Sequence, residues 1–255
     1  MTTETFGDVT VVLDADHVAE VEMHRPPANF FDAGLLAGVV DAMGWANAQG
    51  ARTAVLCSEG RHFCAGLDFG RAATPEPDAL RALYGRAVEL VDGPLPVVVA
   101  TQGASIGGGL GLAMTGDFRV GAPDSRFAAN FARLGFHQGF GLSITLPRAV
   151  GPQMALELLT TGRRIDGTEA LRIGLCDRLD DDPRAGAHVL AAEIAGSAPL
   201  AVRAIRATLR RDLRIQFTAA VDHERSAQVA LMDTDDFREG VNASLERRPP
   251  RFSGC

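Results

Sequence analysis

The chain contains no lysine, so arginine supplies all 25 of its permanently cationic side chains. This absence excludes Schiff-base enzymes, pyridoxal phosphate attachment and any nucleotide site that needs a Walker A lysine. The formal net charge of −7 argues against nucleic acid as a main partner. No apolar run approaches the roughly 20 residues that span a bilayer, so we expect no membrane insertion.

Cysteine is also scarce, and its four positions follow no recognised pattern. Cys57, Cys64, Cys176 and Cys255 show neither C-x-x-C nor zinc-like spacing. We therefore expect free thiols, no disulfide framework and no metal site. The first residues lack the basic stretch and apolar segment of a secretory signal, which favours a cytoplasmic location.

Local patterns predict an α/β protein with one main domain, because 255 residues is near the upper end for such a domain. Alternating and short apolar runs predict a hairpin of strands at 9–13 and 18–23, and buried strands at 53–57 and 96–101. Short strands are expected between 118 and 127. Strand, helix, strand repeats imply parallel pairing of the buried strands.

Helix signals alternate with these strands. Asp32 is placed to cap a helix that Gly50 ends, and a second helix is expected near 78–91. Further helices are expected from about residue 139, at 152–160, over a long stretch at 201–232, and at 236–246.

Two glycine-bearing turns, at residues 61–68 and 103–109, each follow one of the buried strands. Glycine lets a ligand approach the main chain without an intervening Cβ, and successive N–H groups at a strand-to-helix turn attract negative oxygen. The turns therefore predict an oxyanion hole. Tight packing of a helix on the sheet is the simpler alternative. A dinucleotide motif from Gly107 fails because Leu112 stands where a glycine is needed.

Together with their surroundings, these turns resemble the crotonase superfamily, also called the enoyl-CoA hydratase/isomerase family, nearly from end to end. The segments that carry the resemblance are 25–29 (Arg-Pro-Pro-Ala-Asn), 63–68 (Phe-Cys-Ala-Gly-Leu-Asp), the triplet 107–109 with Ala113 and Asp117 behind it, 134–135, 146–148, 158–163, 174–175, 235–240 and 247–252.

The resemblance implies a crotonase-like spiral of ββα turns over residues 1–198, followed by a helical oligomerisation region over residues 199–255. It implies a homo-trimer or a dimer of trimers. It also implies acyl-CoA thioesters as ligands, with coenzyme A as part of the substrate and no tightly bound cofactor.

By the same resemblance, the main-chain N–H groups of Leu67 and Gly108 are the catalytic oxyanion donors. Further substrate contacts are expected from Ala65, Gly66, Asp68, Phe69, Gly107 and Phe131. Arginines near the C-terminus, such as Arg247, Arg248 or Arg251, are candidate phosphate partners or solvated surface residues.

The acid and base positions of the family are vacant in this chain. A family hydratase uses two glutamates, and the corresponding positions hold Gly111 and Phe131, which can transfer no proton. Well-placed acid–base groups contribute on the order of 10² to 10⁴ in rate, so hydration requires substitutes. His137 is the first candidate, although a histidine in a helix-entry loop is often only a hydrogen-bonding residue.

Other polar residues near the turns are weaker candidates. Asp68 and Asp117 are expected to stabilise structure, His62 to lie at the loop rim, and Asn130 to bind water or substrate atoms without acting as a base.

The sequence thus favours an acyl-CoA or enoyl-CoA enzyme of the hydratase/isomerase type with an altered acid–base set. The alternative is a non-catalytic acyl-CoA-binding protein on the same fold. Ser105 raises a Clp-peptidase alternative, but no histidine and orienting group match that pattern.

Overall fold

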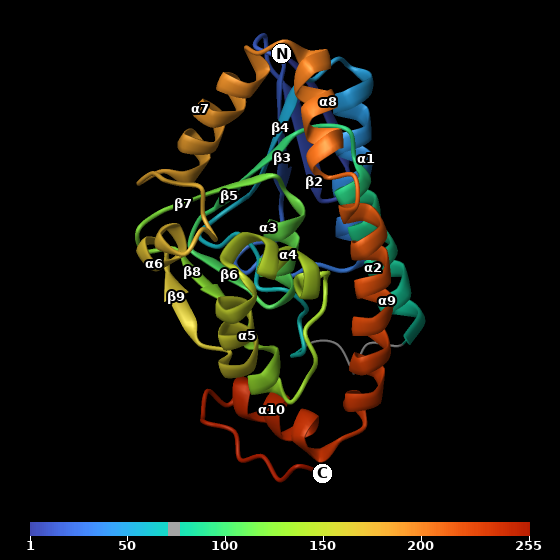
Figure 1. The fold of residues 1–255 in the computed structure, drawn as a ribbon, viewed down its shortest axis with the longest axis vertical. Coiled ribbons are helices and arrows are strands. Elements are labelled where there is room, and N and C mark those ends of the chain that lie inside the picture. The colour runs from blue at the N-terminus through green and yellow to red at the C-terminus, as the bar shows by residue number, and fades with distance from the viewer. Residues whose placement is uncertain (71–76) are drawn as a thin grey trace.

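The computed structural model describes residues 1–70 and 77–255 and shows a mixed α/β fold (Figure 1). A seven-stranded sheet has the order β1-β2-β3-β4-β5-β7-β10. Its strands are β1 (Thr2–Phe6), β2 (Val9–Leu13), β3 (Val18–Met23), β4 (Thr53–Ser58), β5 (Val97–Thr101), β7 (Phe118–Gly121) and β10 (Arg178–Leu179).

The sheet begins antiparallel and continues parallel. β1, β2 and β3 form a meander, and β4, β5, β7 and β10 then add in parallel. All six residues of β4 are buried, as expected for a parallel strand covered on both faces, whereas β2 alternates buried and half-buried positions. The predicted hairpin and parallel strands are confirmed. β1 and β10 were not anticipated.

Helices connect the strands at the places predicted near 33–49, 78–91, 139 and 152–160, whereas the helices at 167–172 and 183–195 were not anticipated. α1 (Ala33–Ala48) begins where the Asp32 side chain accepts a hydrogen bond of 2.8 Å from the Leu35 N–H, which confirms Asp32 as the cap. The others before the C-terminal region are α2 (Pro77–Asp92), α3 (Gly108–Thr115), the 3₁₀ helix η1 (Asn130–Leu134), α4 (Leu142–Val150), α5 (Pro152–Thr161), α6 (Gly167–Arg172) and α7 (Pro183–Ala195).

A second sheet of three strands contains β6 (Ala104–Ile106), β8 (Arg126–Ala128) and β9 (Arg164–Asp166) in the order β6-β8-β9. β6 lies inside residues 103–109, so this segment is a short strand followed by a turn rather than a single turn.

The long helix predicted over 201–232 is two helices. α8 (Pro199–Leu209) ends at Arg210, and α9 (Leu213–Met232) begins three residues later. The Arg210 guanidinium binds Asp117 and the Thr115 carbonyl, which ties the junction to the carboxyl end of α3. These tertiary contacts stabilise the interruption between α8 and α9, which helical periodicity alone does not reveal. α9 then packs along α2 and α4, and α10 (Asp235–Leu245) packs on η1 (Figure 1).

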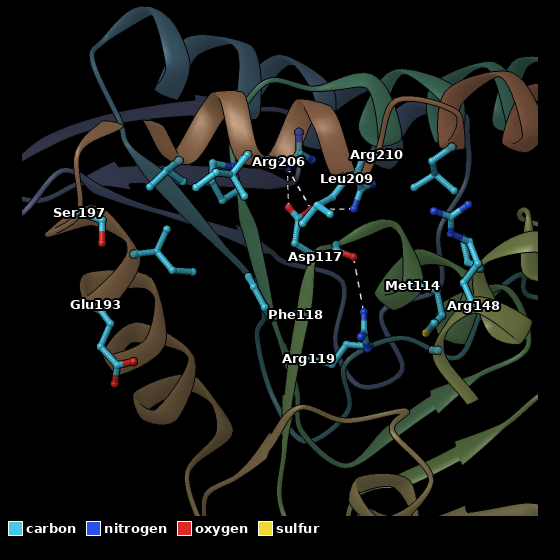
Figure 2. Close-up of a pocket in the computed structure, with 18 residues that line it drawn as sticks. Met114, Asp117, Phe118, Arg119, Arg148, Glu193, Ser197, Arg206, Leu209 and Arg210 are labelled. Carbon is cyan, nitrogen blue, oxygen red and sulfur yellow. Dashed lines mark hydrogen bonds and ion pairs between the residues drawn. The ribbon is translucent and has the colours of Figure 1, made fainter. Parts of the chain in front are cut away.

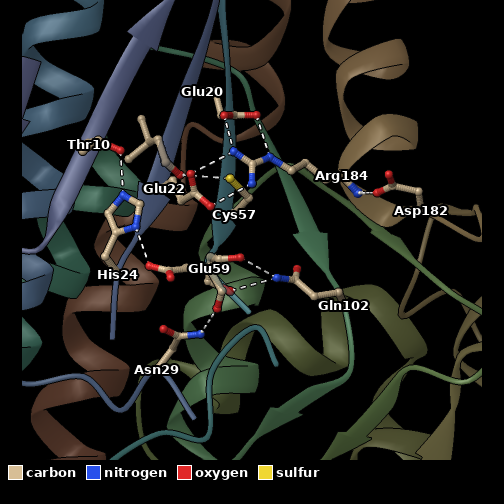
Figure 3. Close-up of polar contacts among 12 residues, drawn as sticks. Thr10, Glu20, Glu22, His24, Asn29, Cys57, Glu59, Gln102, Asp182 and Arg184 are labelled. Atoms are coloured by element: carbon tan, nitrogen blue, oxygen red, sulfur yellow. Dashed lines mark hydrogen bonds and ion pairs between the residues drawn. The ribbon is translucent and has the colours of Figure 1, made fainter. Parts of the chain in front are cut away.

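A cluster of charges joins α7 to β3 (Figure 3). Arg184 donates to Glu20 Oε2 at 2.9 Å and to Glu22 at 2.7 Å, and the His188 ring binds the same Glu20 oxygen at 2.5 Å. Burial alone would raise the pKa of Glu20, but hydrogen bonds from His188 and Arg184 outweigh it and lower the pKa from 4.5 to about 2. The ionised form of Glu20 is therefore favoured in the folded protein.

Replacing Arg184 should make the free energy of unfolding less dependent on pH. Because the folded pKa of Glu20 is depressed, the cluster contributes stability above pH 4.5 and loses it as the pH falls from 4.5 to about 2. We expect Arg184→Met to lower the free energy of unfolding by about 2 kcal/mol at pH 7 after allowance for solvent screening, and by much less near pH 3. Urea unfolding at both pH values measures this difference.

Arg178 offers the matched control, because it binds Glu193 through two hydrogen bonds on an exposed surface. Arg178→Met should barely change stability at either pH. Equal losses in the two variants would contradict a special role for the cluster.

Among the described residues, no single helix is both long and apolar enough to cross a membrane; only the bent pair α7 and α8 meets those criteria together, at an angle of 107°.

Candidate functional site

The two glycine-bearing segments lie side by side through backbone hydrogen bonds. The Cys64 N–H donates to the Ala104 carbonyl at 3.0 Å, and the Cys64 carbonyl accepts from the Ile106 N–H at 3.0 Å. Phe63 extends the pairing with a bond of 2.9 Å to the Gln102 carbonyl. Residues 63–68 therefore run along β6 and reach the start of α3.

Asn29 fixes the outer side of this segment. Its side-chain N–H groups donate to the Glu59 carbonyl at 2.9 Å (Figure 3) and to the His62 carbonyl at 2.7 Å. Asn29 is fully buried and has a φ of +48°, a conformation that asparagine adopts more readily than most residues. The Ala65 N–H also donates to the Ala28 carbonyl at 2.9 Å. The segment is thus held from both sides.

This packing brings the segment that contains Leu67 against the start of α3 at Gly108. Gly66 has a φ of +81°, and a Cβ there would lie 3.1 Å from the Gly108 nitrogen. Gly66 is therefore the close-approach position between the two segments, and Leu67 follows it directly. Neither the Leu67 N–H nor the Gly108 N–H has an acceptor in the described part of the chain.

Gly108 is the first residue of α3, so the partial positive charge of the helix N-terminus adds to that of its N–H. Two free donors at a helix N-terminus form a site for a negative oxygen.

A cavity of about 330 Å³ opens at these donors. The predicted site residues that line it are Ala65, Leu67, Asp68, Phe69, Gly107, Gly108 and Phe131. Gly66 and Gly111 are buried and do not line the cavity. Gly66 acts through the close approach described above. The structure therefore brings the predicted donors and most of the predicted contacts into one cavity.

Aromatic residues occupy the space beside Gly111, which the resemblance implies to be the first vacant acid position. A Cβ at Gly111 would lie 2.4 Å from the Phe140 Cβ, and a Cβ at Gly108 would lie 2.6 Å from the tip of the Phe31 ring. Phe31 and Phe140 contact each other with ring centroids 5.2 Å apart. Gly111 is thus matched to Phe140, since any larger side chain would collide with that ring. Phe131, which the resemblance implies to stand at the second acid position, lines the same cavity.

The cavity also contains residues that sequence reasoning missed. Tyr84 comes from α2, Gln228 from α9, and Ser244 and Leu245 from α10. No local motif marks them, because only the packing of α9 and α10 over the core carries them to the glycine turns. One feature of the sequence indicated that Tyr84 could lie near the site, because it belongs to the helix predicted between the two strands that precede the glycine turns.

His137 lies outside the set of described residues that line the cavity. Its Nδ1 contacts the Gln138 carbonyl at 2.8 Å, and its ring meets His223 edge-on at 5.9 Å. A proton-transfer role for His137 stays a prediction and requires the imidazole to turn toward the cavity.

The Ser105 hydroxyl is fully buried, has no hydrogen-bond partner among the described residues and does not line the cavity. This placement gives no support to a serine nucleophile.

A second cavity, of about 640 Å³, lies at the other end of α3 (Figure 2). There Arg206 and Arg210 share Asp117, with distances of 2.8 and 2.7 Å, which confirms Asp117 as a pairing residue. Arg210 and Arg119 also donate to the carbonyls of Thr115 and Gly116. These cations neutralise the negative carboxyl end of α3 and the Asp117 carboxylate. The arrangement has a structural explanation and offers no N–H pair like that at Gly108.

A third cavity, of about 680 Å³, adjoins the first on the outside. The two cavities share Phe30, Phe31, Leu67, Asp68 and Phe69, and the outer one adds the charged pair Arg25 and Asp32. The Leu67 donor therefore lies where an inner cavity, which contains Tyr84, Phe131 and Phe140, meets an outer one that adds this ion pair.

Of the predicted C-terminal phosphate partners, Arg248 binds Glu239 and Glu246. Its charge is already neutralised, so it would have to exchange these carboxylates for a phosphate.

Comparisons with known proteins agree on one family. The model of the family "Enoyl-CoA hydratase/isomerase" matches residues 14–254. Cyclohexa-1,5-dienecarbonyl-CoA hydratase of Thauera aromatica is 34% identical, with 96% of each chain covered. Carnitinyl-CoA dehydratase of Proteus mirabilis is 34% identical, with 93% of this chain and 95% of that protein covered. A solved enoyl-CoA hydratase/isomerase of Pseudoalteromonas atlantica has a TM-score of 0.84 at 28% identity, covering 96% of this chain and all of that one. The crotonase-like fold expected from the sequence is confirmed.

Proposed function

Because this chain belongs to the enoyl-CoA hydratase/isomerase family, a crotonase-type family of enzymes that act on acyl-CoA thioesters, we propose that it polarises a thioester carbonyl with the N–H groups of Leu67 and Gly108. The observation that supports this proposal most is the close approach of Gly66 to Gly108, which sets two unpartnered N–H groups at one cavity. Each such donor contributes roughly 3 kcal/mol to an oxyanion-like transition state.

We propose that the chemistry after polarisation uses an altered acid–base set. Phe140 fills the space beside Gly111, and Phe131 faces the cavity at the second position. Charge on the α-carbon is then delocalised into the thioester oxygen, and water or another cavity group must move the protons. The substrate thioester brings its own coenzyme A, and the proposal needs no tightly bound cofactor or metal.

We also propose that the helices after residue 199 make a homo-trimer or a dimer of trimers. The α8 helix buries none of its residues in the single chain and exposes Leu200, Ile205 and Leu209. Such an apolar face is typical of a contact between subunits. Sedimentation equilibrium gives the mass, and a purely monomeric protein would contradict this proposal.

Turnover and binding on one panel of CoA thioesters test the proposed function. The panel measures hydration, dehydration, double-bond shift, decarboxylation and thioester hydrolysis, together with calorimetric binding of each thioester. We expect turnover in at least one assay. Tight binding without turnover in all of them would instead support the non-catalytic acyl-CoA-binding protein.

The prediction for His137 is tested with His137→Ala. If the imidazole carries a proton, turnover should fall by about 10²-fold or more while acyl-CoA affinity changes little. Matched activity of the variant and the unaltered protein would remove His137 from the mechanism.

A further inference from the structure

A hydrogen-bonded pair of neutral side chains lines the inner part of the aromatic cavity. The Tyr84 hydroxyl on α2 donates to the Gln228 side-chain carbonyl on α9 at 2.6 Å. The Gln228 side-chain N–H donates in turn to the His137 carbonyl at 3.0 Å. Tyr84 is 6% exposed and Gln228 is 1% exposed, so the pair is fixed in a nearly dry position.

The pair keeps hydrogen-bonding capacity that the protein does not use. A phenolic oxygen has one donor and two acceptor positions. Tyr84 uses the donor on Gln228 and has the backbone amide of Phe140 as a further hydrogen-bond neighbour, which leaves one acceptor position. Gln228 keeps one acceptor position and one N–H. A group that both donates and accepts complements this pair.

The surroundings favour a neutral group over an ion. Burial raises the pKa of Tyr84, so its hydroxyl stays protonated, and the carboxyl group of Glu224 lies close enough to raise this pKa further. The Phe140 ring packs edge-on against Tyr84 at 6.3 Å. Arg164, on β9, also lines the cavity, but in the described part of the chain the Tyr84–Gln228 pair makes no hydrogen bond or ion pair with it. An ammonium ion beside the pair would lose its hydration to aromatic walls.

The position of the pair relative to Leu67 assigns it to the acyl group. The inner and outer cavities meet at Phe31 and Leu67, and only the inner one contains Tyr84 and Gln228. Coenzyme A is large and charged and must reach solvent, so a thioester held at Leu67 places it toward the outer cavity, where residues 26–27 are exposed, and directs its acyl group inward.

We propose that Tyr84 and Gln228 form a hydroxyl-recognition position, so that the preferred substrate is an acyl-CoA whose acyl group carries a neutral hydroxyl beyond the third carbon. This inference rests on the proposed function of the same cavity. Tyr84 and Gln228 are specificity-determining residues in this account and take no part in proton transfer.

Binding of matched saturated thioesters tests the inference, because saturated acyl groups cannot be hydrated during the measurement. The probes are hexanoyl-CoA and its three analogues hydroxylated at the fourth, fifth or sixth carbon. We expect at least one analogue to bind at least about fivefold more tightly than hexanoyl-CoA, which is the gain that one buried hydrogen bond provides.

Tyr84→Phe and, independently, Gln228→Leu should abolish that preference while leaving hexanoyl-CoA affinity nearly unchanged. Ser244→Ala, which removes a different cavity hydroxyl, should keep it.

Tyr84 is the only tyrosine of the chain, so a protein labelled with ¹³C at the tyrosine Cζ gives a single signal from this residue. The preferred analogue should shift that signal more than hexanoyl-CoA does. Equal affinity for all four thioesters, or a preference that survives in both Tyr84→Phe and Gln228→Leu, would overturn the inference and leave the proposed function intact. Failure of all four thioesters to bind would refute the proposed function itself.

Discussion

Gly108→Pro is expected to lower kcat/KM by about 10² to 10³-fold on any thioester that the enzyme turns over, because it deletes one of the two oxyanion donors. Gly108 is the first residue of α3, where proline is tolerated by a helix, so the substitution removes the N–H with little direct cost to helical structure. Steady-state kinetics, with circular dichroism to verify folding, measure the effect.

Gly108→Ala is the matched control for this variant. Both substitutions place a Cβ 2.6 Å from the Phe31 ring, but alanine keeps the N–H. If crowding of Phe31 were the cause, the two variants would lose similar activity, and Phe31→Ala would rescue both. We expect the alanine variant to retain most of its activity and Phe31→Ala to leave the proline variant impaired.

Gly111→Glu is expected to lower the free energy of unfolding by about 3 kcal/mol rather than simply restore a missing acid. Its Cβ would lie 2.4 Å from the Phe140 Cβ, and a carboxylate would enter an apolar wall. The loss should shrink when Phe140→Gly is present, with a coupling of about 2 kcal/mol in the double-mutant cycle measured by urea unfolding.

Phe140 also has a φ of +61°, so glycine at this position accepts the native backbone without strain. Additive losses in the cycle would show that Phe140 does not occupy the place of the missing acid. In that case the packing of Phe140 would not explain why residue 111 is glycine rather than an acid.

The parts of the fold that sequence predicted are those with local causes. Asp32 caps α1 through the N–H of a residue three positions ahead, and the apolar run of β4 is buried as its composition requires. The two glycine segments were recognisable because only glycine leaves the backbone free of a side chain, and glycine is read directly from the sequence.

The parts that sequence missed depend on contacts between distant segments. The break between α8 and α9 is held by Arg210 on Asp117 and the end of α3, nearly a hundred residues earlier. Tyr84 and Gln228 are 144 positions apart and meet only because α9 packs on α2. The match between Gly111 and Phe140 likewise exists only in three dimensions. Periodicity and motifs contain no information on such pairs.

A crystal structure with bound hexanoyl-CoA shows directly whether Leu67 and Gly108 hold the thioester carbonyl. We expect the thioester oxygen to lie about 3 Å from both the Leu67 and Gly108 nitrogens, with the acyl chain in the inner cavity. A thioester oxygen that contacts neither nitrogen, or a ligand bound instead at the carboxyl end of α3, would contradict this expectation.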